Sequence, residues 1–240
     1  MEVPYLKSLV ELAGEVDSME YYYSALSSLG RYYCNLNRLD SLTYWGNMVD
    51  SVTKARRETP LAKFDFLNYY CRYYLINGEY ELAMNEAVML QMLSKEKNNM
   101  TGLISSNEYL GLVYLLIGRD SDAVTAFEEA LDLLKTKSKP DYELQIIPYL
   151  LIAYLHLDEL DHVKSALARF EEALQKIESY KSDIWENYPI KAKKCLLYAN
   201  YLNLYVAEKN LPKARETVSL LPSYKDESMG PDVTSVYDLA

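Results

Sequence analysis

The sequence is poor in the residues that interrupt regular structure, and it has no long apolar run. Among 240 residues there are only 8 glycines and 8 prolines, which leaves few turns for a β-rich fold. The longest apolar stretch, residues 146–157, is broken by Pro148 and His156 and is too short to span a bilayer. The start lacks a basic region followed by an apolar run, so no signal peptide is expected. The chain as written is expected to be soluble, with no membrane segment.

Cysteine and histidine are also scarce, which argues against metal centres and disulfide frameworks. The 3 cysteines, Cys34, Cys71 and Cys195, are dispersed, and no CxxC spacing occurs. The 2 histidines, His156 and His162, are six positions apart, a spacing that does not place two ligands on one helical face. We therefore expect no metal site and no cofactor.

Basic residues are outnumbered by acidic ones, and the formal net charge is −10 with a pI of about 4.8. A nucleic-acid-binding surface needs clustered Lys and Arg. The densest group, Lys191, Lys193 and Lys194, is more typical of a solvated helix face. Nucleic-acid binding by this segment is not expected.

Catalytic patterns are missing as well. No GxSxG, HExxH or P-loop sequence is present. The acidic pairs Glu128-Glu129 and Glu171-Glu172 have no His, Lys or Cys partner at a suitable spacing, and we expect both to lie on solvated outer faces. The sequence predicts no catalytic residues and a protein that is not an enzyme.

What the chain does have is a long internal period. Five tyrosines, Tyr33, Tyr74, Tyr114, Tyr154 and Tyr205, recur at spacings of 40 or 41 residues, with 51 before the last. Four residues after each comes a turn former or polar residue, and five residues further a small or aliphatic one. These positions are, respectively, Asn37, Gly78, Gly118, Asp158 and Lys209, then Leu42, Ala83, Ala123, Val163 and Ala214. A fixed long period indicates one supersecondary unit copied along the chain.

Each copy is predicted to be a pair of helices joined by a tight turn, because apolar residues follow the helical period. The expected repeats span residues 18–60, 61–100, 103–140, 141–181 and 182–222, after a lone helix over residues 3–13. We expect residues 97–102 to form the loop that follows the second repeat, and Ser105 or Ser106 to cap the first helix of the third. Pro148 is expected either to kink the first helix of the fourth repeat or to lie near its start. Residues 232–240 resemble the beginning of a further helix, as if the chain were cut within a repeat, which would leave an uncapped end and a route to a homodimer.

The third repeat carries a specific resemblance. Leu110-Gly111-x-x-Tyr114, then Gly118, then Ala123-x-x-x-Phe127-x-x-Ala130 is similar to the tetratricopeptide repeat (TPR) signature, with departures only at Asn107 and Lys135. The resemblance covers about residues 18–222. The family norm is 34 residues per repeat, so the longer period here resembles the extended arrays of bacterial regulators and sensors, including the large Bacteroidetes sensor proteins.

The resemblance implies an all-α fold, a right-handed α-solenoid of about five helical hairpins plus irregular terminal helices. It also implies a concave groove lined by the first helix of each repeat. Aligned with the family, the groove positions are Ser27, Arg31, Asn35, Asp65, Asn68, Arg72, Leu75, Glu108, Leu112, Leu115, Gln145, Ile152, Leu155, Leu196, Asn203 and Val206.

Two parts of this groove have alternative interpretations. Arg31 and Arg72 with Asn35 and Asn68 could hold the terminal carboxylate of a peptide, or the arginines could pair with carboxylates such as Asp65. The aliphatic stripe of Leu112, Leu115, Ile152 and Leu155 is either a peptide groove or ordinary packing.

The function implied is a non-catalytic module that binds a protein or peptide, as the sensory or scaffolding part of a larger bacterial regulatory protein. The alternative is a structural spacer without a groove ligand. The compartment stays open: cytoplasmic as written, or periplasmic if the chain is an excised sensor region.

Overall fold

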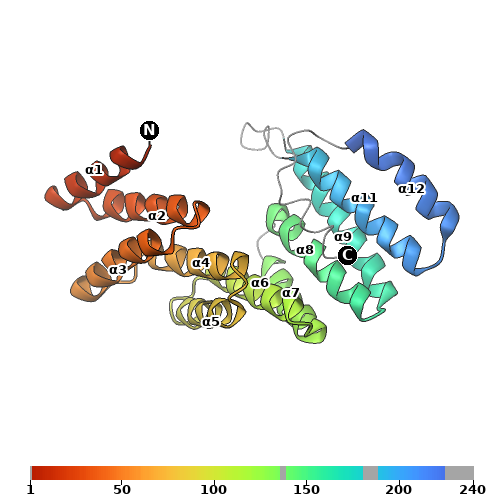
Figure 1. Cartoon of the computed structure of the whole chain (residues 1–240), viewed down its shortest axis with the longest axis horizontal. Helices are drawn as coiled ribbons and strands as arrows, with labels where there is room; N and C mark the ends of the chain where they lie inside the picture. Colours follow the sequence, from red (N-terminus) through yellow and green to blue (C-terminus); the bar gives the residue numbers. More distant parts are fainter. Residues whose placement is uncertain (1, 136–138, 181–188, 225–240) are drawn as a thin grey trace. The chain divides into compact units, whose positions relative to one another are not determined.

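The fold is all-α, as the sequence predicts. The computed structural model describes residues 2–135, 139–180 and 189–224, and these contain eleven helices and no strand (Figure 1). The expected start of the fifth repeat at residue 182 and the expected partial helix over residues 232–240 lie outside the described residues. The helices are α1 (Glu2–Glu15), α2 (Met19–Asn35), α3 (Leu39–Arg56), α4 (Leu61–Ile76), α5 (Tyr80–Glu96), α6 (Met100–Leu116), α7 (Asp120–Leu134), α8 (Pro140–His156), α9 (Leu160–Ser179), α11 (Ile190–Ala207) and α12 (Leu211–Tyr224).

The chain divides into two compact units, residues 1–113 and 114–240, and the division falls within α6. In the first unit α2 packs on α1 and α3, and α4 packs on α5. In the second unit α8 packs on α7 and α9, and α11 packs on α12. The first helices of successive repeats also meet, α2 with α4 and α8 with α11. Helices adjacent in sequence thus form antiparallel pairs, and within each unit the first helices of successive pairs pack together.

The recurring tyrosine marks the end of every first helix. The backbone N–H five residues later donates to the carbonyl of Tyr33, Tyr74, Tyr114, Tyr154 and Tyr205, at 3.0, 2.9, 2.8, 2.9 and 2.8 Å. The residue before that donor has positive φ in all five repeats: Asn37 54°, Gly78 74°, Gly118 75°, Asp158 58° and Lys209 57°. This is the Schellman pattern of hydrogen bonds around one left-handed residue. The predicted turns are therefore confirmed, and the spacing from the tyrosine to the turn residue has a backbone cause.

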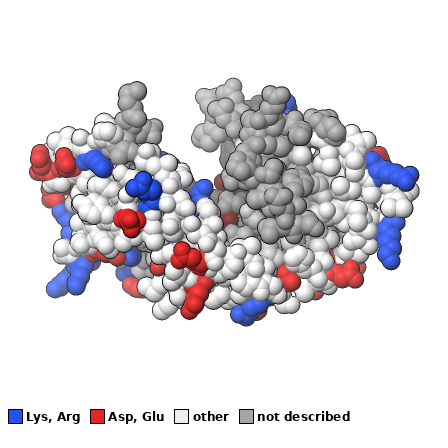
Figure 2. All heavy atoms as spheres, viewed as in Figure 1, with Lys and Arg blue, Asp and Glu red and all other residues white. Residues whose placement is uncertain are grey.

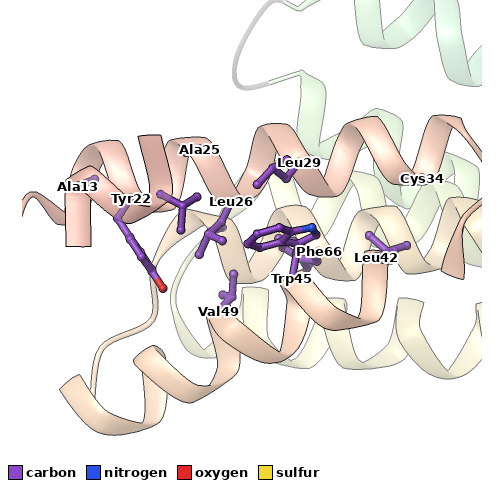
Figure 3. Close-up of a cluster of buried hydrophobic side chains, with 12 residues drawn as sticks. Ala13, Tyr22, Ala25, Leu26, Leu29, Cys34, Leu42, Trp45, Val49 and Phe66 are labelled. Carbon is purple, nitrogen blue, oxygen red and sulfur yellow. The ribbon is translucent and has the colours of Figure 1, made fainter. Parts of the chain in front are cut away.

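The small or aliphatic residue after each turn anchors the second helix in the core. Leu42, Ala83, Ala123 and Val163 are fully buried and Ala214 is nearly so. In the first unit, Figure 3 shows Leu26 and Leu29 of α2 facing Trp45 and Val49 of α3. The three cysteines are buried, and none of them forms a disulfide.

Three local expectations need correction. Residues 97–102 are not all loop, because α6 begins at Met100, where the side-chain oxygen of Asn99 accepts the N–H of Gly102 at 3.1 Å. Asn99, rather than Ser105 or Ser106, is thus the N-cap. Of the two alternatives for Pro148, a helix that begins near it is wrong, because α8 begins at Pro140 and Pro148 lies in its interior.

The expectation that Glu128 lies on a solvated face is also wrong. Its Oε1 accepts a hydrogen bond of 2.6 Å from the hydroxyl of Tyr154, a side chain only 5% exposed. In the same way, Glu171 on α9 accepts a hydrogen bond from the hydroxyl of Tyr201 on α11. Glu129 and Glu172, by contrast, are exposed, as the sequence predicts. In both contacts a tyrosine on a first helix donates to a glutamate on the preceding second helix, and the hydrogen bond satisfies a hydroxyl in the seam between the two helices.

Gly30 permits the close approach of α2 to α4. A Cβ at this position would lie 2.7 Å from Cζ of Phe66 and 2.9 Å from the ring of Tyr69. Phe66 is fully enclosed and cannot yield easily. We expect Gly30→Ala to lower the free energy of unfolding by about 1–3 kcal/mol through overpacking. Urea denaturation of the whole chain measures this change.

Gly14→Ala is the matched control, because a Cβ there would meet only Tyr22, at 3.8 Å. That variant should be neutral or more stable by up to about 1 kcal/mol, since alanine favours helix. Equal losses in the two variants would contradict a tight crossing at Gly30.

Glu128→Ala is expected to lower the free energy of unfolding by about 1–3 kcal/mol, because the buried hydroxyl of Tyr154 loses its acceptor. Glu129→Ala removes the same charge from the neighbouring exposed position and should change stability by about 0.5 kcal/mol or less. Thermal denaturation of both variants at neutral pH provides the comparison. A Glu128→Ala variant as stable as Glu129→Ala would show that the hydroxyl finds another partner.

Candidate functional site

A pocket of about 710 Å³ lies in the first unit, between the first helices of two successive repeats. We call it the α2–α4 pocket. Its lining residues are Glu20, Tyr23, Ser24, Ser27, Ser28 and Arg31 from α2, Glu58, Thr59 and Pro60 from the loop after α3, and Leu61, Ala62, Asp65 and Tyr69 from α4. On α2 these positions follow the helical spacing, so a single face of the helix forms one wall.

Two hydrogen bonds hold two of the carboxylates of this pocket, Asp65 and Glu58, in place. Oγ of Ser27 donates to Oδ2 of Asp65 at 2.7 Å, and the hydroxyl of Tyr23 donates to Oε1 of Glu58 at 2.7 Å. Each carboxylate keeps a second oxygen that can accept further hydrogen bonds. The pocket therefore offers positioned acceptors to a ligand.

Burial makes the charge on Asp65 costly. Loss of solvent raises the pKa of Asp65 above its ordinary value, while the hydrogen bond from Ser27 and the charge of Arg31 act in the opposite direction. Burial and the nearby carboxylate of Asp65 also raise the pKa of Tyr69 to about 12. Tyr69 is therefore a neutral hydroxyl and an aromatic wall at neutral pH.

The predicted groove positions of the first unit are distributed unevenly. Ser27, Arg31 and Asp65 line the α2–α4 pocket, whereas Asn35, Asn68, Arg72 and Leu75 do not. Asn35 and Arg72 are exposed, Leu75 and Leu112 are half-buried, and Glu108 is buried. The Asn68 amide is engaged within its own helix, donating to the carbonyl of Phe64 at 2.8 Å. The charge of Arg72 acts on Cys34 and Tyr109.

In the second unit the aliphatic positions are mostly enclosed. Leu115 and Ile152 are 9% and 7% exposed, and Leu155 and Asn203 are half-buried. Leu196 is buried, while Gln145 and Val206 are exposed. The enclosure of Leu115 and Ile152 favours the packing interpretation of the stripe over an open peptide groove.

Several pocket residues were not among the predicted site residues. Glu20, Tyr23 and Ser24 continue the face of Ser27 and Arg31 toward the start of α2, so the helical period alone could have identified them. Glu58 and Thr59 come from a loop, and no periodicity indicates where a loop residue points.

The second unit has its own polar contacts. Arg169 donates to Oε1 of Glu143 at 2.7 Å and to the carbonyl of Leu131 at 3.1 Å, so this guanidinium ties three helices together. Nδ1 of His156 lies 2.9 Å from Oδ1 of Asp120, and the ring of His162 stacks on Tyr154. Among the residues that the structure describes, no three His, Cys, Asp or Glu side chains are grouped so that they could hold a metal ion.

The visible charged surface is mixed. Figure 2 shows Lys and Arg scattered among Asp and Glu over this face, separated by uncharged residues. Within the described ranges, no helix is both long enough and apolar enough to cross a bilayer.

Comparison with known proteins identifies the fold. No family model matches the chain, and no curated protein matches it significantly. The chain is similar to a solved structure of the nearly identical TPR-like repeats of a Podosopora anserina chain described as a putative kinesin light chain, with a TM-score of 0.58 and 16% identity. A single-residue variant of that chain gives 0.59 and 15%. Both alignments cover 84% of this chain and 93% of the other. The fold is therefore TPR-like.

The raised pKa of Asp65 sets a pH dependence of stability. A carboxyl whose pKa is higher in the folded state destabilises the fold when it is ionised, and that cost disappears as the pH falls through its pKa. We expect Asp65→Asn, which keeps an acceptor for Ser27, to equal or exceed the wild type at neutral pH by up to about 1 kcal/mol. That advantage should shrink at about pH 4.

Urea denaturation at the two pH values measures the difference. If Asp65→Asn were less stable than the wild type at neutral pH, and by the same margin at about pH 4, Asp65 would not be a carboxylate destabilised by burial.

Proposed function

We propose that this chain is a non-catalytic repeat module that binds a protein or peptide, with the α2–α4 pocket as part of its binding surface. TPR-like repeats generally serve as protein-binding scaffolds and are usually non-catalytic. The observation that carries the proposal is the position of the pocket. It lies between the first helices of two successive repeats, the helices whose residues the family resemblance assigns to the groove.

The character of the pocket suits an extended peptide. Its volume of about 710 Å³ is within the range of about 300–1,000 Å³ that is usual for ligand sites. It combines hydroxyls that can donate or accept, fixed carboxylates, two tyrosine rings and the apolar side chain of Leu61, which is 75% exposed. A peptide backbone needs donors and acceptors along its length, and its side chains need walls to pack against.

The chemistry of the pocket supports binding rather than catalysis. The nearest arrangement to an activated nucleophile is the hydroxyl of Ser27, which donates to Asp65 at 2.7 Å. A carboxylate is far too weak a base to ionise a serine hydroxyl at neutral pH, and nucleophilic serines rely on a stronger base. The Ser27–Asp65 contact therefore positions a carboxylate and does not prepare a nucleophile.

In the first unit the proposed binding surface extends beyond the pocket along the first helices, to Asn35, Asn68, Arg72, Leu75 and Leu112. In the second unit, taken by itself, the half-buried positions Leu155 and Asn203 belong to the proposal. The family positions Glu108, Leu115 and Ile152 are buried and are not included. The family resemblance supports these assignments, with the exposed Asn35 and Arg72 the most accessible. The long repeats further support the proposal that the module is the sensory or scaffolding part of a larger bacterial regulatory protein.

The proposal predicts that blocking the pocket abolishes peptide binding. Peptides selected on the whole chain from a random library would be measured by fluorescence anisotropy against the wild type and two variants. Ser24 is exposed and lines the pocket, so Ser24→Trp fills it without disturbing the core. We expect Ser24→Trp to weaken binding about tenfold or more, which corresponds to about 1.4 kcal/mol.

Thr125→Trp adds the same bulk at an exposed position of α7 and serves as the control. Binding that survives Ser24→Trp would place the site elsewhere. If none of the library peptides binds, the result would favour a structural spacer.

A further inference from the structure

The α2–α4 pocket has an excess of negative charge. Glu20, Glu58 and Asp65 contribute three carboxylates, and among the described residues that line it Arg31 is the one cation. Two neighbouring cations are engaged elsewhere: Arg56 pairs with Asp17, and Lys63 pairs with Asp50 at 2.6 Å. The pocket therefore carries an uncompensated charge of about −2 at neutral pH.

A site that binds a carboxylate carries positive charge, whereas this pocket is negative. A clamp for a peptide's C-terminus needs several cations or amides converging on one point. Of Arg31, Asn35, Asn68 and Arg72, only Arg31 lines the pocket. Asp65 faces the same space and would repel an incoming carboxylate. The geometry thus excludes the interpretation that the arginines and asparagines form one anion site in this pocket.

The pocket instead has the features that recognise a cation. Asp65 and Glu58 are each held by one hydroxyl, through Oδ2 and Oε1, so each keeps its other oxygen available. Tyr23 and Tyr69 line the same space. A guanidinium or ammonium group gains from carboxylates at hydrogen-bonding distance and from aromatic faces within about 6 Å.

The energetic state of Asp65 points the same way. Burial raises its pKa, so its charge is stabilised less well than in water. The Arg31 charge and the Ser27 hydrogen bond offset that cost only in part, since the net shift is upward. A second cation would supply the missing stabilisation, because a buried carboxylate is most favourable when it is paired.

We propose that the α2–α4 pocket binds a basic side chain, Arg or Lys, of an extended peptide, with Glu58 and Asp65 as its counter-charges. This inference rests on the proposed peptide-binding function and assigns its ligand class. Arg31 then acts as an internal cation that competes with the ligand for Asp65.

The test uses the whole chain and three labelled peptides of equal length whose variable positions are all Arg, all Gln or all Glu. Fluorescence anisotropy measures each dissociation constant at about 0.15 M salt. We expect the Arg peptide to bind about tenfold or more tightly than the other two. Tighter binding of the Glu peptide would overturn the proposal.

Two double variants separate the pocket from the general acidity of the chain. Glu58→Gln with Asp65→Asn removes two charges inside the pocket, and Glu129→Gln with Asp161→Asn removes two exposed charges in the second unit. The pocket variant should weaken binding of the Arg peptide about tenfold or more, and the control variant should weaken it less than about threefold. Equal weakening would mean diffuse attraction and would overturn the proposal. Melting curves establish that both variants are folded.

Arg31→Gln gives the sharpest prediction, because it must strengthen binding of the Arg peptide by removing the competing cation. A carboxylate site would instead lose affinity for the Glu peptide on the same substitution. If a Gln or Glu peptide binds best and Ser24→Trp abolishes that binding, the proposed peptide-binding function stands and the basic-ligand inference falls. If no charged or library peptide binds, both fall.

Discussion

The fold depends on one backbone arrangement, the hydrogen bond that closes the end of each first helix. The carbonyl of the recurring tyrosine accepts the N–H five residues later, and the intervening left-handed residue turns the chain back. Because that turn has a fixed length, the next helix begins at a fixed distance and its fourth residue faces the core. Leu42, Ala83, Ala123 and Val163 are fully buried for this reason. The turn costs little where the residue is Gly78 or Gly118, and elsewhere Asn, Asp or Lys tolerates the left-handed conformation.

The features predictable from the sequence are those that local chemistry determines. The tyrosine-to-turn spacing, the helical pairs and the buried position after each turn all follow from short segments. The cap of α6 was missed because residues 97–106 contain several residues that can cap a helix, and only the fold selects Asn99. Glu128 was misplaced for a related reason. Its partner, Tyr154, is 26 positions away, and no local pattern reveals that its hydroxyl needs an acceptor on α7.

The site was predictable to a similar degree. Alignment with the repeat family placed Ser27, Arg31 and Asp65 among the groove positions, and all three line the α2–α4 pocket. The helical period would have extended the α2 face to Glu20 and Tyr23. The net charge of the pocket was not predictable. The charge depends on Glu58, which lies in a loop. It also depends on the orientation of α4, because Arg72 of that helix is not among the described residues that line the pocket. These two side chains, Glu58 in the lining and Arg72 outside it, change the ligand that we propose from an acidic to a basic peptide group, although the helices themselves are as expected.

One type of contact, a tyrosine hydroxyl donating to a glutamate, serves two purposes in this chain. In the second unit Tyr154 and Glu128 meet in a seam where little solvent enters, and the contact satisfies a hydroxyl during packing. In the first unit Tyr23 and Glu58 meet beside an open pocket, and the same contact presents a carboxylate. The difference arises at the end of α3. Arg57 adopts a left-handed conformation and Pro60 an extended one, so residues 58–60 run beside α2 before α4 begins. The proposed binding site would thus use the same contact as the packed seam between Tyr154 and Glu128, with loop residues 58–60 lining the pocket beside it.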